Sequence, residues 1–253
     1  MNLLHPILPD VAARVATIST QRGGGVSKMP YAAADGSGGF NLATHVGDEA
    51  IAVADNRAAL RRMLPAEPVW LNQVHGTAVF HARAAQLLTS PPIADACIAT
   101  EPGVVCAVLT ADCLPVLLCD VTGSVVGAAH AGWRGLAGGV LQHTVAAMRA
   151  AGATDIRAWL GPAIGPNKFE VGAEVRAAFC SLDQAAEQAF VALAGCPGKY
   201  MADLYALARL ALAQVGVVLV SGGDQCTASQ PDDYFSFRRD PHCGRMASLI
   251  WIR

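Results

Sequence analysis

The chain has 253 residues, of which 53% are hydrophobic and 15% are charged, and its formal net charge at pH 7 is −2. This composition provides ample material for a large core, yet charges and Pro/Gly breaks interrupt every window of about 18 residues, so we expect no membrane span. No run of Lys and Arg is longer than a pair, which excludes the electrostatic signature of a nucleic-acid-binding protein.

Hydrophobic periodicity and turn residues divide the chain into predicted strands and helices. In chain order these are strand 12–18, helix 49–64, strands 68–74, 77–82, 104–109, 114–119 and 125–130, helix 136–152, strand 156–160, helices 173–182 and 202–216, and strands 217–220 and 245–252. The glycine-rich stretch 23–39 is predicted to be a loop. Strands occur both in hairpin succession and separated by helices, which favours an α+β fold with mixed β-sheets and packed helices. Since no repeat or linker interrupts it, the whole of 1–253 is predicted to be one domain.

The start of the chain and its cysteines indicate in which redox environment the protein is expected to lie. Residues 1–20 lack a basic n-region and reach Asp10 and Arg14 early, so they do not resemble a secretory signal, and we expect a cytoplasmic protein. The eight cysteines are then expected to be reduced and mostly buried. No Cys-x-x-Cys pair occurs, which excludes a zinc ribbon and a thioredoxin-type motif. Any metal site must combine distant parts of the chain.

Two predicted strands, 114–119 and 125–130, flank the segment DVTGS, whose residues favour a tight reversal. An antiparallel hairpin with this turn places Cys113 opposite or diagonal to residues 130–132. Opposed residues have Cβ atoms about 5 Å apart, which suits a thiolate and an imidazole that share one zinc ion. Cys113 and His130 are therefore a candidate zinc-binding pair. A buried cysteine beside a hydrogen-bonded core histidine gives the same pattern.

A third ligand is sought among the other histidines. His75 ends the segment VWLNQVHG, where a polar group closes a predicted strand and site residues commonly lie; the alternative is a simple turn histidine. His143 falls beside apolar positions of a predicted helix and fits a core or boundary role, whereas His45, in NLATHVGD, fits a pocket residue. Three mixed nitrogen and sulfur ligands leave one tetrahedral position open, as in catalytic zinc sites.

The segments NQVHG, TADCLPVLL and AAHAGWRG resemble the signature segments of the polyphenol oxidase (laccase-domain) family, whose members are also known as purine nucleoside phosphorylases and peptidoglycan-editing factors. Further matching segments follow in the expected order, among them RGGGVS, NLATHVGD, GPAIGPNKFEVG, GGDQCT and YFSFRRD. The resemblance covers nearly the whole chain and implies two interlocked subdomains around a cleft. It also implies that His75, Cys113 and His130 bind one zinc ion, in agreement with the hairpin argument.

The family name suggests a copper oxidase, but the residues oppose this reading. A multicopper oxidase needs several His-x-His pairs, and the seven histidines of this chain form none, so copper is not expected. The resemblance implies instead that purine nucleosides and phosphate are the partners, through phosphorolysis of adenosine, inosine, guanosine and methylthioadenosine, and that adenosine is also deaminated. Zinc can activate water for attack on C6 of adenine. We expect a monomer.

The remaining candidate site residues have weaker support. Arg22, in RGGGVS, is the candidate for phosphate binding because a guanidinium and exposed backbone amides suit an anion; it could equally be a surface arginine beside a loop. Asp112 is a candidate general base, or a residue that caps a turn. Four others are expected either to line the pocket and bind substrate or to hold loops: Asn41, His45, Gln73 and Arg134.

Two other functions use the same residues. In the first, Cys113 is a nucleophile and His130 its base, in a hydrolase that acts on an amide such as a cell-wall precursor. In the second, zinc stabilises a binding module that has no catalytic role and acts through a partner protein. The sequence leaves both alternatives open.

Overall fold

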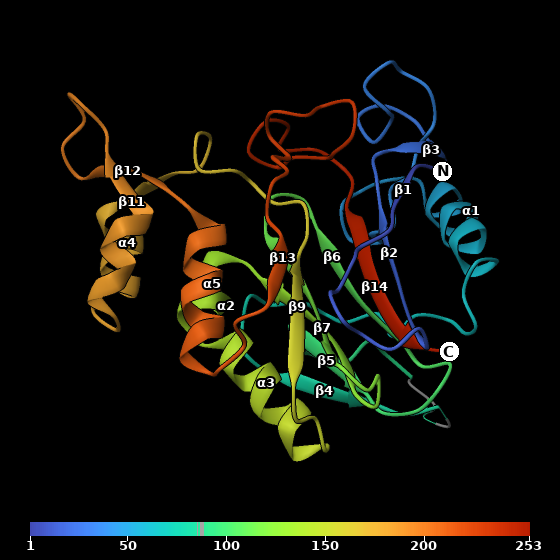
Figure 1. The fold of residues 1–253 in the computed structure, drawn as a ribbon. Helices are drawn as coiled ribbons and strands as arrows, with labels where there is room; N and C mark the ends of the chain where they lie inside the picture. Colours follow the sequence, from blue (N-terminus) through green and yellow to red (C-terminus); the bar gives the residue numbers. More distant parts are fainter. Residues whose placement is uncertain (85, 87–88) are drawn as a thin grey trace.

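The computed structural model describes residues 1–84, 86 and 89–253, and it shows two β-sheets packed against each other with helices on their outer sides (Figure 1). The four-stranded sheet has the order β1-β2-β14-β6, formed by Leu3–Leu4, Val15–Thr20, Met246–Ile252 and Val105–Thr110. The six-stranded sheet has the order β13-β9-β7-β8-β5-β4, formed by Val220–Gly222, Ile156–Leu160, Leu114–Asp120, Val126–Ala131, Ala96–Ala99 and Val79–Ala82. Its pairs β4–β5 and β13–β9 are parallel and the others antiparallel. The predicted mixed sheets with packed helices are confirmed.

The other elements surround these two sheets. The helices are α1 (Ala50–Arg61), α2 (Trp133–Ala137), α3 (Val140–Ala150), α4 (Ala173–Cys180), α5 (Leu204–Gln214) and the 3-10 helix η1 (Gln184–Ala189). A three-stranded sheet, β10-β12-β11, is formed by Glu170–Gly172, Lys199–Ala202 and Phe190–Ala192 and lies with α4 beyond α5 (Figure 1). β3 (Gly23–Ser27) packs beside α1. Among the described residues, no helix has the length and apolarity needed to cross a membrane.

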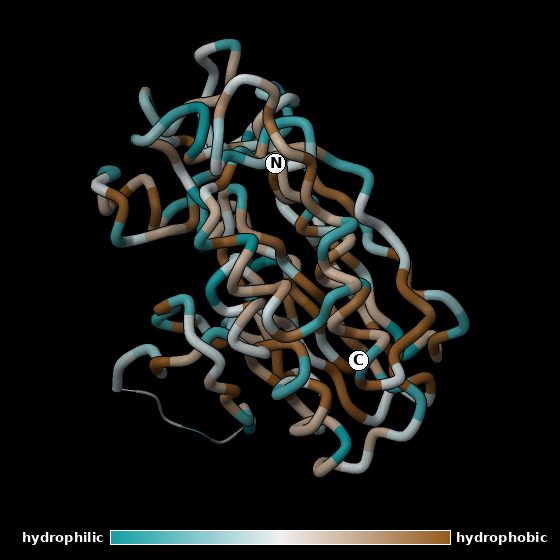
Figure 2. Tube along the Cα trace, turned by 90° about the vertical axis from the view of Figure 1, so that its left-hand side faces the viewer, coloured by the Kyte–Doolittle hydropathy of each residue, from teal (hydrophilic) through white to brown (hydrophobic). Residues whose placement is uncertain are grey.

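The core between the two large sheets explains why their central strands are so apolar. Cys106 and Val108 of β6 and Ile250 of β14 pack in one cluster with Leu117 of β7 and Val126 of β8. Helices α2, α3 and α5 cover the opposite face of the six-stranded sheet, and α1 covers that of the four-stranded sheet. Since both faces are covered, every position of β6, β7, β8 and β14 is buried. Figure 2 shows hydrophobic segments in the middle of the molecule, with hydrophilic residues concentrated in the outer loops.

Several predicted boundaries are wrong, each for a local reason. The predicted helix 136–152 is two helices, α2 and α3, because Gly139 between them adopts a φ of 94°, a left-handed conformation that interrupts a helix. The predicted strand 68–74 forms only isolated bridges at Val69 and Asn72. Part of the predicted loop 23–39 is strand β3, where a Cβ at Gly25 would lie 2.2 Å from the Gly39 carbonyl oxygen; glycine there permits close backbone pairing. β5 escaped prediction because it is short and lacks alternation.

The β7–β8 hairpin has the predicted register. Leu114 pairs with Ala131 and Pro115 with His130. Cys113 directly precedes β7, and the continued register places it opposite Gly132 and diagonal to His130. The hairpin thus carries a thiol and an imidazole at the same end of the sheet.

The other end of the hairpin is fixed by Asp120. Its Oδ1 accepts hydrogen bonds from the backbone N–H groups of Thr154, at 2.9 Å, and Asp155, at 3.1 Å, and its Oδ2 accepts from the backbone N–H of Thr122 at 3.1 Å and from the Thr122 hydroxyl. Burial alone would raise the pKa of Asp120, but these hydrogen bonds lower it to about 2. One carboxylate therefore joins the hairpin turn to the start of β9.

Asp120→Asn should lower the free energy of unfolding at pH 7 by about 2 kcal/mol, because an amide cannot accept hydrogen bonds through both of its ends. The folded state holds the ionised form of Asp120, so this stabilisation is complete above the pKa of an unfolded aspartate, about 3.9. It is lost as the pH falls toward the folded pKa of about 2. Urea denaturation should therefore show a smaller deficit for the variant at pH 3 than at pH 7. Asp35→Asn, which changes an exposed turn carboxylate bonded to Ser37, is the control; an equal deficit there would contradict the assignment.

Candidate metal centre

A cavity of about 420 Å³ lies where β6 passes into β7 and β8 passes into α2. One part of its lining is apolar, and a second part consists of basic and aromatic side chains. The third part is a cluster of His75, Cys113 and His130. A pocket of this volume accommodates a small organic ligand.

The three candidate ligands lie together. The donor atoms of His75, Cys113 and His130 are all within 4.8 Å of one another, and Cys113 Sγ is 3.8 Å from His75 Nε2. The two imidazole rings are 4.8 Å apart, at an angle of 73°. A tetrahedral ion with bonds of about 2.0–2.3 Å holds its ligand atoms roughly 3.5 Å apart, so a metal ion fits among these donors with small adjustments. His130 is buried whereas His75 is exposed, which leaves one side of the cluster open to the cavity.

Asp95 was not predicted as a site residue, yet its carboxylate contacts both histidine segments of this cluster. It is fully buried. Its Oδ1 lies 2.8 Å from His130 Nδ1 and accepts from the His75 backbone N–H at 2.9 Å, while Oδ2 accepts from the N–H groups of Val74 and Gly76 at 3.1 and 2.7 Å. The contact with Nδ1 leaves His130 Nε2 for a metal ion. The signal in the sequence was a single aspartate inside the apolar run IADACIA, but β5, which follows it, was not predicted.

These hydrogen bonds also stabilise an unusual backbone. His75 has a φ of 59°, in the left-handed region that costs free energy for a residue with a Cβ. Three successive N–H groups, from Val74 to Gly76, converge on the carboxylate of Asp95. Asp95 therefore stabilises the turn from which the His75 side chain reaches the hairpin.

The electrostatics of the cluster favour the ligand form of the thiol. Burial opposes ionisation of Cys113, but the neighbouring His130 and His75 rings outweigh it and lower its pKa. Burial also disfavours the charged form of His130, but the thiolate of Cys113 and the carboxylate of Asp95 raise its pKa. A thiolate is the form of cysteine that binds metals. His130, in contrast, must release its proton before it can bind a metal ion, so metal binding would displace a proton from this cluster.

Gly132 leaves room for this arrangement. A Cβ at this position would lie 2.8 Å from Cys113 Sγ and 3.0 Å from His75 Cδ2. The backbone φ of Gly132 is −61°, which any residue can adopt. Space between the ligands, and not backbone freedom, therefore requires glycine here.

Gly132→Ala should weaken metal binding, tested with zinc, by about 10- to 100-fold, because the added methyl group displaces two of the three candidate ligands. Competition with a chromogenic chelator measures this affinity. Gly127→Ala is the matched control: Gly127 lies in β8, and its added Cβ would be 3.2 Å from Sδ of Met148 in α3, away from the candidate ligands. Equal zinc affinity of the two variants would show that the spacing at Gly132 is unimportant.

The structure gives the other candidate residues different surroundings. Gln73 lines the cavity, but its side-chain amide donates to the Leu109 carbonyl and accepts from the Leu109 N–H, each at 2.8 Å. The side chain thus forms the two hydrogen bonds that a backbone partner in the predicted strand 68–74 would have formed. Asp112 also lines it; its carboxylate accepts from the Thr227 hydroxyl at 2.5 Å and the Arg238 backbone N–H at 2.6 Å. His45 and Arg134 line the cavity.

Arg22 and Asn41 are not among the described residues that line this cavity. The Arg22 guanidinium is buried and donates to the carbonyl oxygens of Ala32, at 2.8 Å, and Pro231, at 3.1 Å. Burial and the neighbouring Arg239 lower its pKa. These contacts hold loops together, whereas the sequence analysis expected Arg22 to bind an anion.

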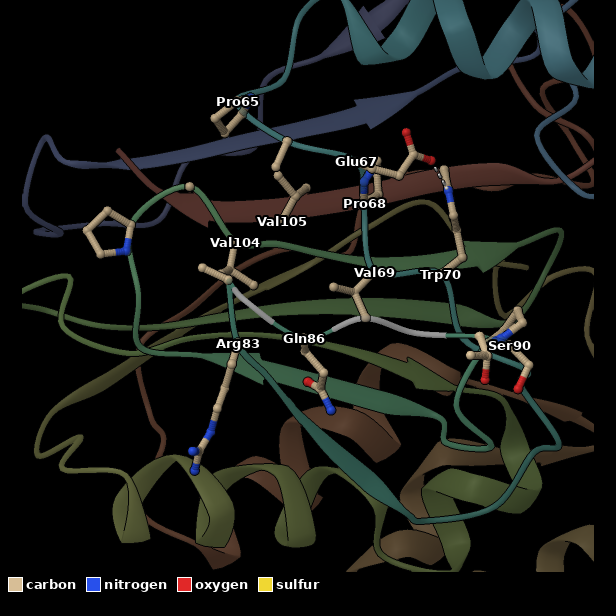
Figure 3. A pocket seen from close by; sticks show the side chains of 16 residues that line it. Pro65, Glu67, Pro68, Val69, Trp70, Arg83, Gln86, Ser90, Val104 and Val105 are labelled. Carbon is tan, nitrogen blue, oxygen red and sulfur yellow. Dashed lines mark hydrogen bonds between the residues drawn. The ribbon is translucent and has the colours of Figure 1, made fainter.

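A second and larger cavity, of about 600 Å³, lies beside the loop that carries Glu67 and Trp70 (Figure 3). Prolines at positions 65, 68, 91 and 102 contribute to its walls, and Trp70 Nε1 donates to Glu67. Among its described lining residues there is no histidine or cysteine. Among the described residues, the His-Cys-His group that could hold a metal ion is therefore in the smaller cavity.

Fold and site together define a two-sheet protein with one His-Cys-His group that could hold a metal ion in a ligand-sized cavity. The sequence model of the multi-copper polyphenol oxidoreductase laccase family matches residues 16–253, and the chain belongs to this family. The resemblance drawn from NQVHG, TADCLPVLL and AAHAGWRG is thereby confirmed.

Individual relatives are similar along their whole length. The chain is 47% identical over 249 residues to purine nucleoside phosphorylase PA4543 of Pseudomonas aeruginosa, with 98% of each chain covered. It is 50% identical over 244 residues to purine nucleoside phosphorylase YfiH of Escherichia coli, with 94% of each covered. The crystal structure of Neisseria meningitidis protein NMB0706 superimposes with a TM-score of 0.90 at 48% identity, over 100% of this chain and 99% of that one. The names of the relatives suggest an enzyme.

Proposed function

We propose that the protein is a zinc-dependent purine nucleoside phosphorylase that also deaminates adenosine. The observation that carries this proposal is the cluster of His75, Cys113 and His130 on a cavity of about 420 Å³, in a chain about half identical to two proteins named purine nucleoside phosphorylase. The cavity combines apolar walls with a few polar groups, as in sites for aromatic ligands.

The donor set favours zinc, although the family description names copper. Two imidazoles and a thiolate with an open fourth position are typical of catalytic zinc. The same donors occur in blue-copper sites, where a methionine commonly completes the coordination, but no methionine is among the described residues that line this cavity. Elemental analysis of the purified protein distinguishes the two metals directly.

The residues of the cavity have separate roles in the proposed reactions. Bound zinc supplies Lewis-acid activation of water or of a substrate oxygen. Leu71, Ile164 and Phe169 provide apolar surface for a purine ring. Asp112 is the single carboxylate among the described lining residues, so we assign it the exchange of a proton with the substrate. Its hydrogen bonds from Thr227 and the Arg238 N–H fix the carboxylate in place.

A panel of nucleosides assayed with and without phosphate tests the function. With phosphate, adenosine, inosine, guanosine and methylthioadenosine should each release the free base and a pentose 1-phosphate. Without phosphate, adenosine should still form inosine, because deamination needs water alone. Absence of turnover by the zinc-loaded protein for every nucleoside, in both conditions, would overturn the proposal.

A second candidate is a cysteine hydrolase that acts on an amide such as a cell-wall precursor. The observation in its favour is that Cys113 reaches the cavity in one group with His130, its expected base, and with His75, whose Nε2 lies 3.8 Å from Sγ; such cysteine–histidine pairs also occur with nucleophilic cysteines. The two functions differ in their response to treatment. A hydrolase keeps its activity after chelation and loses it on alkylation with iodoacetamide, whereas the zinc enzyme is inactivated by the chelator and recovers when zinc is returned.

A further inference from the structure

The cavity that contains the metal cluster is rich in positive charge. Arg134, Arg238 and Arg245 line it together with His45. None of the three arginines forms an ion pair with an acidic side chain within the described chain. The carboxylate of Asp112, in the same lining, is already hydrogen-bonded by Thr227 and by a backbone N–H. The cavity therefore offers uncompensated cations to a ligand.

Arg245 is the best placed of these cations. Its Nη1 donates to the carbonyl oxygens of Cys243, at 2.8 Å, and Gly244, at 3.0 Å, and its guanidinium lies 5.7 Å from the centre of the Phe237 ring. These contacts fix the plane of the guanidinium. Nε and Nη2 donate to no other group of the described chain, and together they form the two-pronged edge that binds an oxyanion in a bidentate manner.

Asn41 links Arg245 to the loop that carries His45 through hydrogen bonds of its side chain. It is fully buried, and its Oδ1 accepts from the backbone N–H of Arg245 at 2.9 Å and of Ala43 at 3.0 Å. Its Nδ2 donates to Asp48 at 2.9 Å. Hydrogen bonds of one side chain thus span the loop on both sides of His45 and anchor it to the start of β14. A buried polar residue with this many partners produces a rigid surface.

The charge around His45 is consistent with this placement. Burial lowers the pKa of His45, and the positive charges of Arg245 and Arg57 lower it further. The Arg57 guanidinium is held over the Trp70 ring at 4.2 Å and donates to the Leu42 carbonyl. Cations that repel one another are gathered here, and an anionic ligand would relieve that repulsion.

We propose that Arg245 and His45 form a subsite for inorganic phosphate, with Arg238 at its border; the identity of the anion rests on the proposed phosphorylase activity. In that reaction an oxygen of hydrogen phosphate forms a bond to C1′ of the pentose while the bond from C1′ to the purine nitrogen breaks. The electron pair of that bond leaves with the base, and the proton of hydrogen phosphate ends on the base. Phosphate held by Arg245 is kept in the same cavity as the metal cluster.

Two measurements on the zinc-loaded protein test the subsite. In the first, inorganic phosphate is added without nucleoside, at constant ionic strength, and the melting temperature is recorded; wild-type protein should show a phosphate-dependent rise that Arg245→Gln loses. In the second, Arg245→Gln should raise the KM for phosphate at least tenfold and change the KM for inosine less than twofold. Arg245→Lys, which keeps the charge without the fork, should give an intermediate KM.

The control is Arg209→Gln, because Arg209 also donates to two backbone carbonyls, those of Val220 and Gly222, but is not among the residues that line the cavity. It should keep the wild-type response to phosphate. Wild-type phosphate binding in a folded Arg245→Gln or Arg245→Lys protein would overturn the subsite even where phosphorolysis is observed. Arg245-dependent phosphate binding without any nucleoside turnover would support the subsite and refute the phosphorylase. Arg245-dependent binding of adenosine monophosphate, with no response to inorganic phosphate, would also overturn it.

Discussion

Cys113→Ser should empty the metal centre and abolish nucleoside cleavage. A serine hydroxyl is a poor zinc ligand at neutral pH, and Cys113 is the single cysteine of the His-Cys-His group among the described residues, so no thiol of that group replaces it. We expect bound zinc to fall from about one ion per chain to less than about 0.1. With the metal lost, kcat/KM for inosine should fall by about 10³-fold or more, since a Lewis acid supplies several kcal/mol of transition-state stabilisation. Metal analysis and the phosphorolysis assay measure the two effects.

Cys226→Ser is the matched control for this variant. Cys226 is also half-buried, and its Sγ accepts a hydrogen bond from the Gly165 N–H at 3.2 Å, yet it belongs to no metal-binding group of the described residues. It should keep zinc and activity. Removal of zinc should lower the melting temperature only modestly, because a large core holds the fold. Full zinc occupancy in Cys113→Ser would refute the ligand assignment, and unfolding on chelation would make the metal structural.

The second large effect is expected for Asp95→Asn. An amide group has one acceptor oxygen where the carboxylate has two, so its NH₂ must face either His130 Nδ1 and the His75 N–H or the N–H groups of Val74 and Gly76. The buried donors left without partners should lower the free energy of unfolding by about 3 kcal/mol. The misaligned imidazole should also weaken zinc binding by about 10- to 100-fold. Denaturation and chelator competition measure these changes separately.

A carboxylate outside the site provides the comparison. Glu101 accepts from the backbone N–H of Ala84 at 2.9 Å in an exposed position, so Glu101→Gln loses a similar hydrogen bond without contact with the metal centre. It should bind zinc as the wild type does. Unchanged zinc affinity in a folded Asp95→Asn protein would show that Asp95 supports the fold alone and does not position His130.

The sequence predicted those parts of the site whose geometry is determined by residues close together in the chain. The turn DVTGS and two apolar strands determine a hairpin register, and that register alone brings Cys113 near His130. The boundaries of α1, α4 and α5 followed from periodicity in the same way. Such patterns involve residues close together in the chain, whose spacing is fixed by the backbone.

The rest depends on contacts between distant segments. The carboxylate of Asp95 forms hydrogen bonds with the turn at His75, 20 residues earlier in the chain, and with the imidazole of His130, 35 residues later. Periodicity in the sequence does not reveal such contacts between distant segments. Gln73 was recognised as a site residue, but its pairing with Leu109 became visible only in the fold. The sequence predicts Arg245 only as the first residue of the strand 245–252, and not as a site residue. Its importance arises from the loop of His45, about 200 residues away, to which Asn41 joins it.

The shared carboxylate of Asp95 has a consequence for how this chain tolerates change. The turn that carries His75 and the strand that carries His130 both form hydrogen bonds with Oδ1 of Asp95, so the effect of a substitution in either segment depends on the state of the other. Such epistasis makes single changes at positions 74–76, 95 and 130 more harmful than their individual contacts suggest, while paired changes in them combine less than additively. The apolar walls have a different constraint: Leu71, Ile164 and Phe169 are buried members of the hydrophobic core, so a change there alters packing and leaves the hydrogen bonds of Asp95 in place.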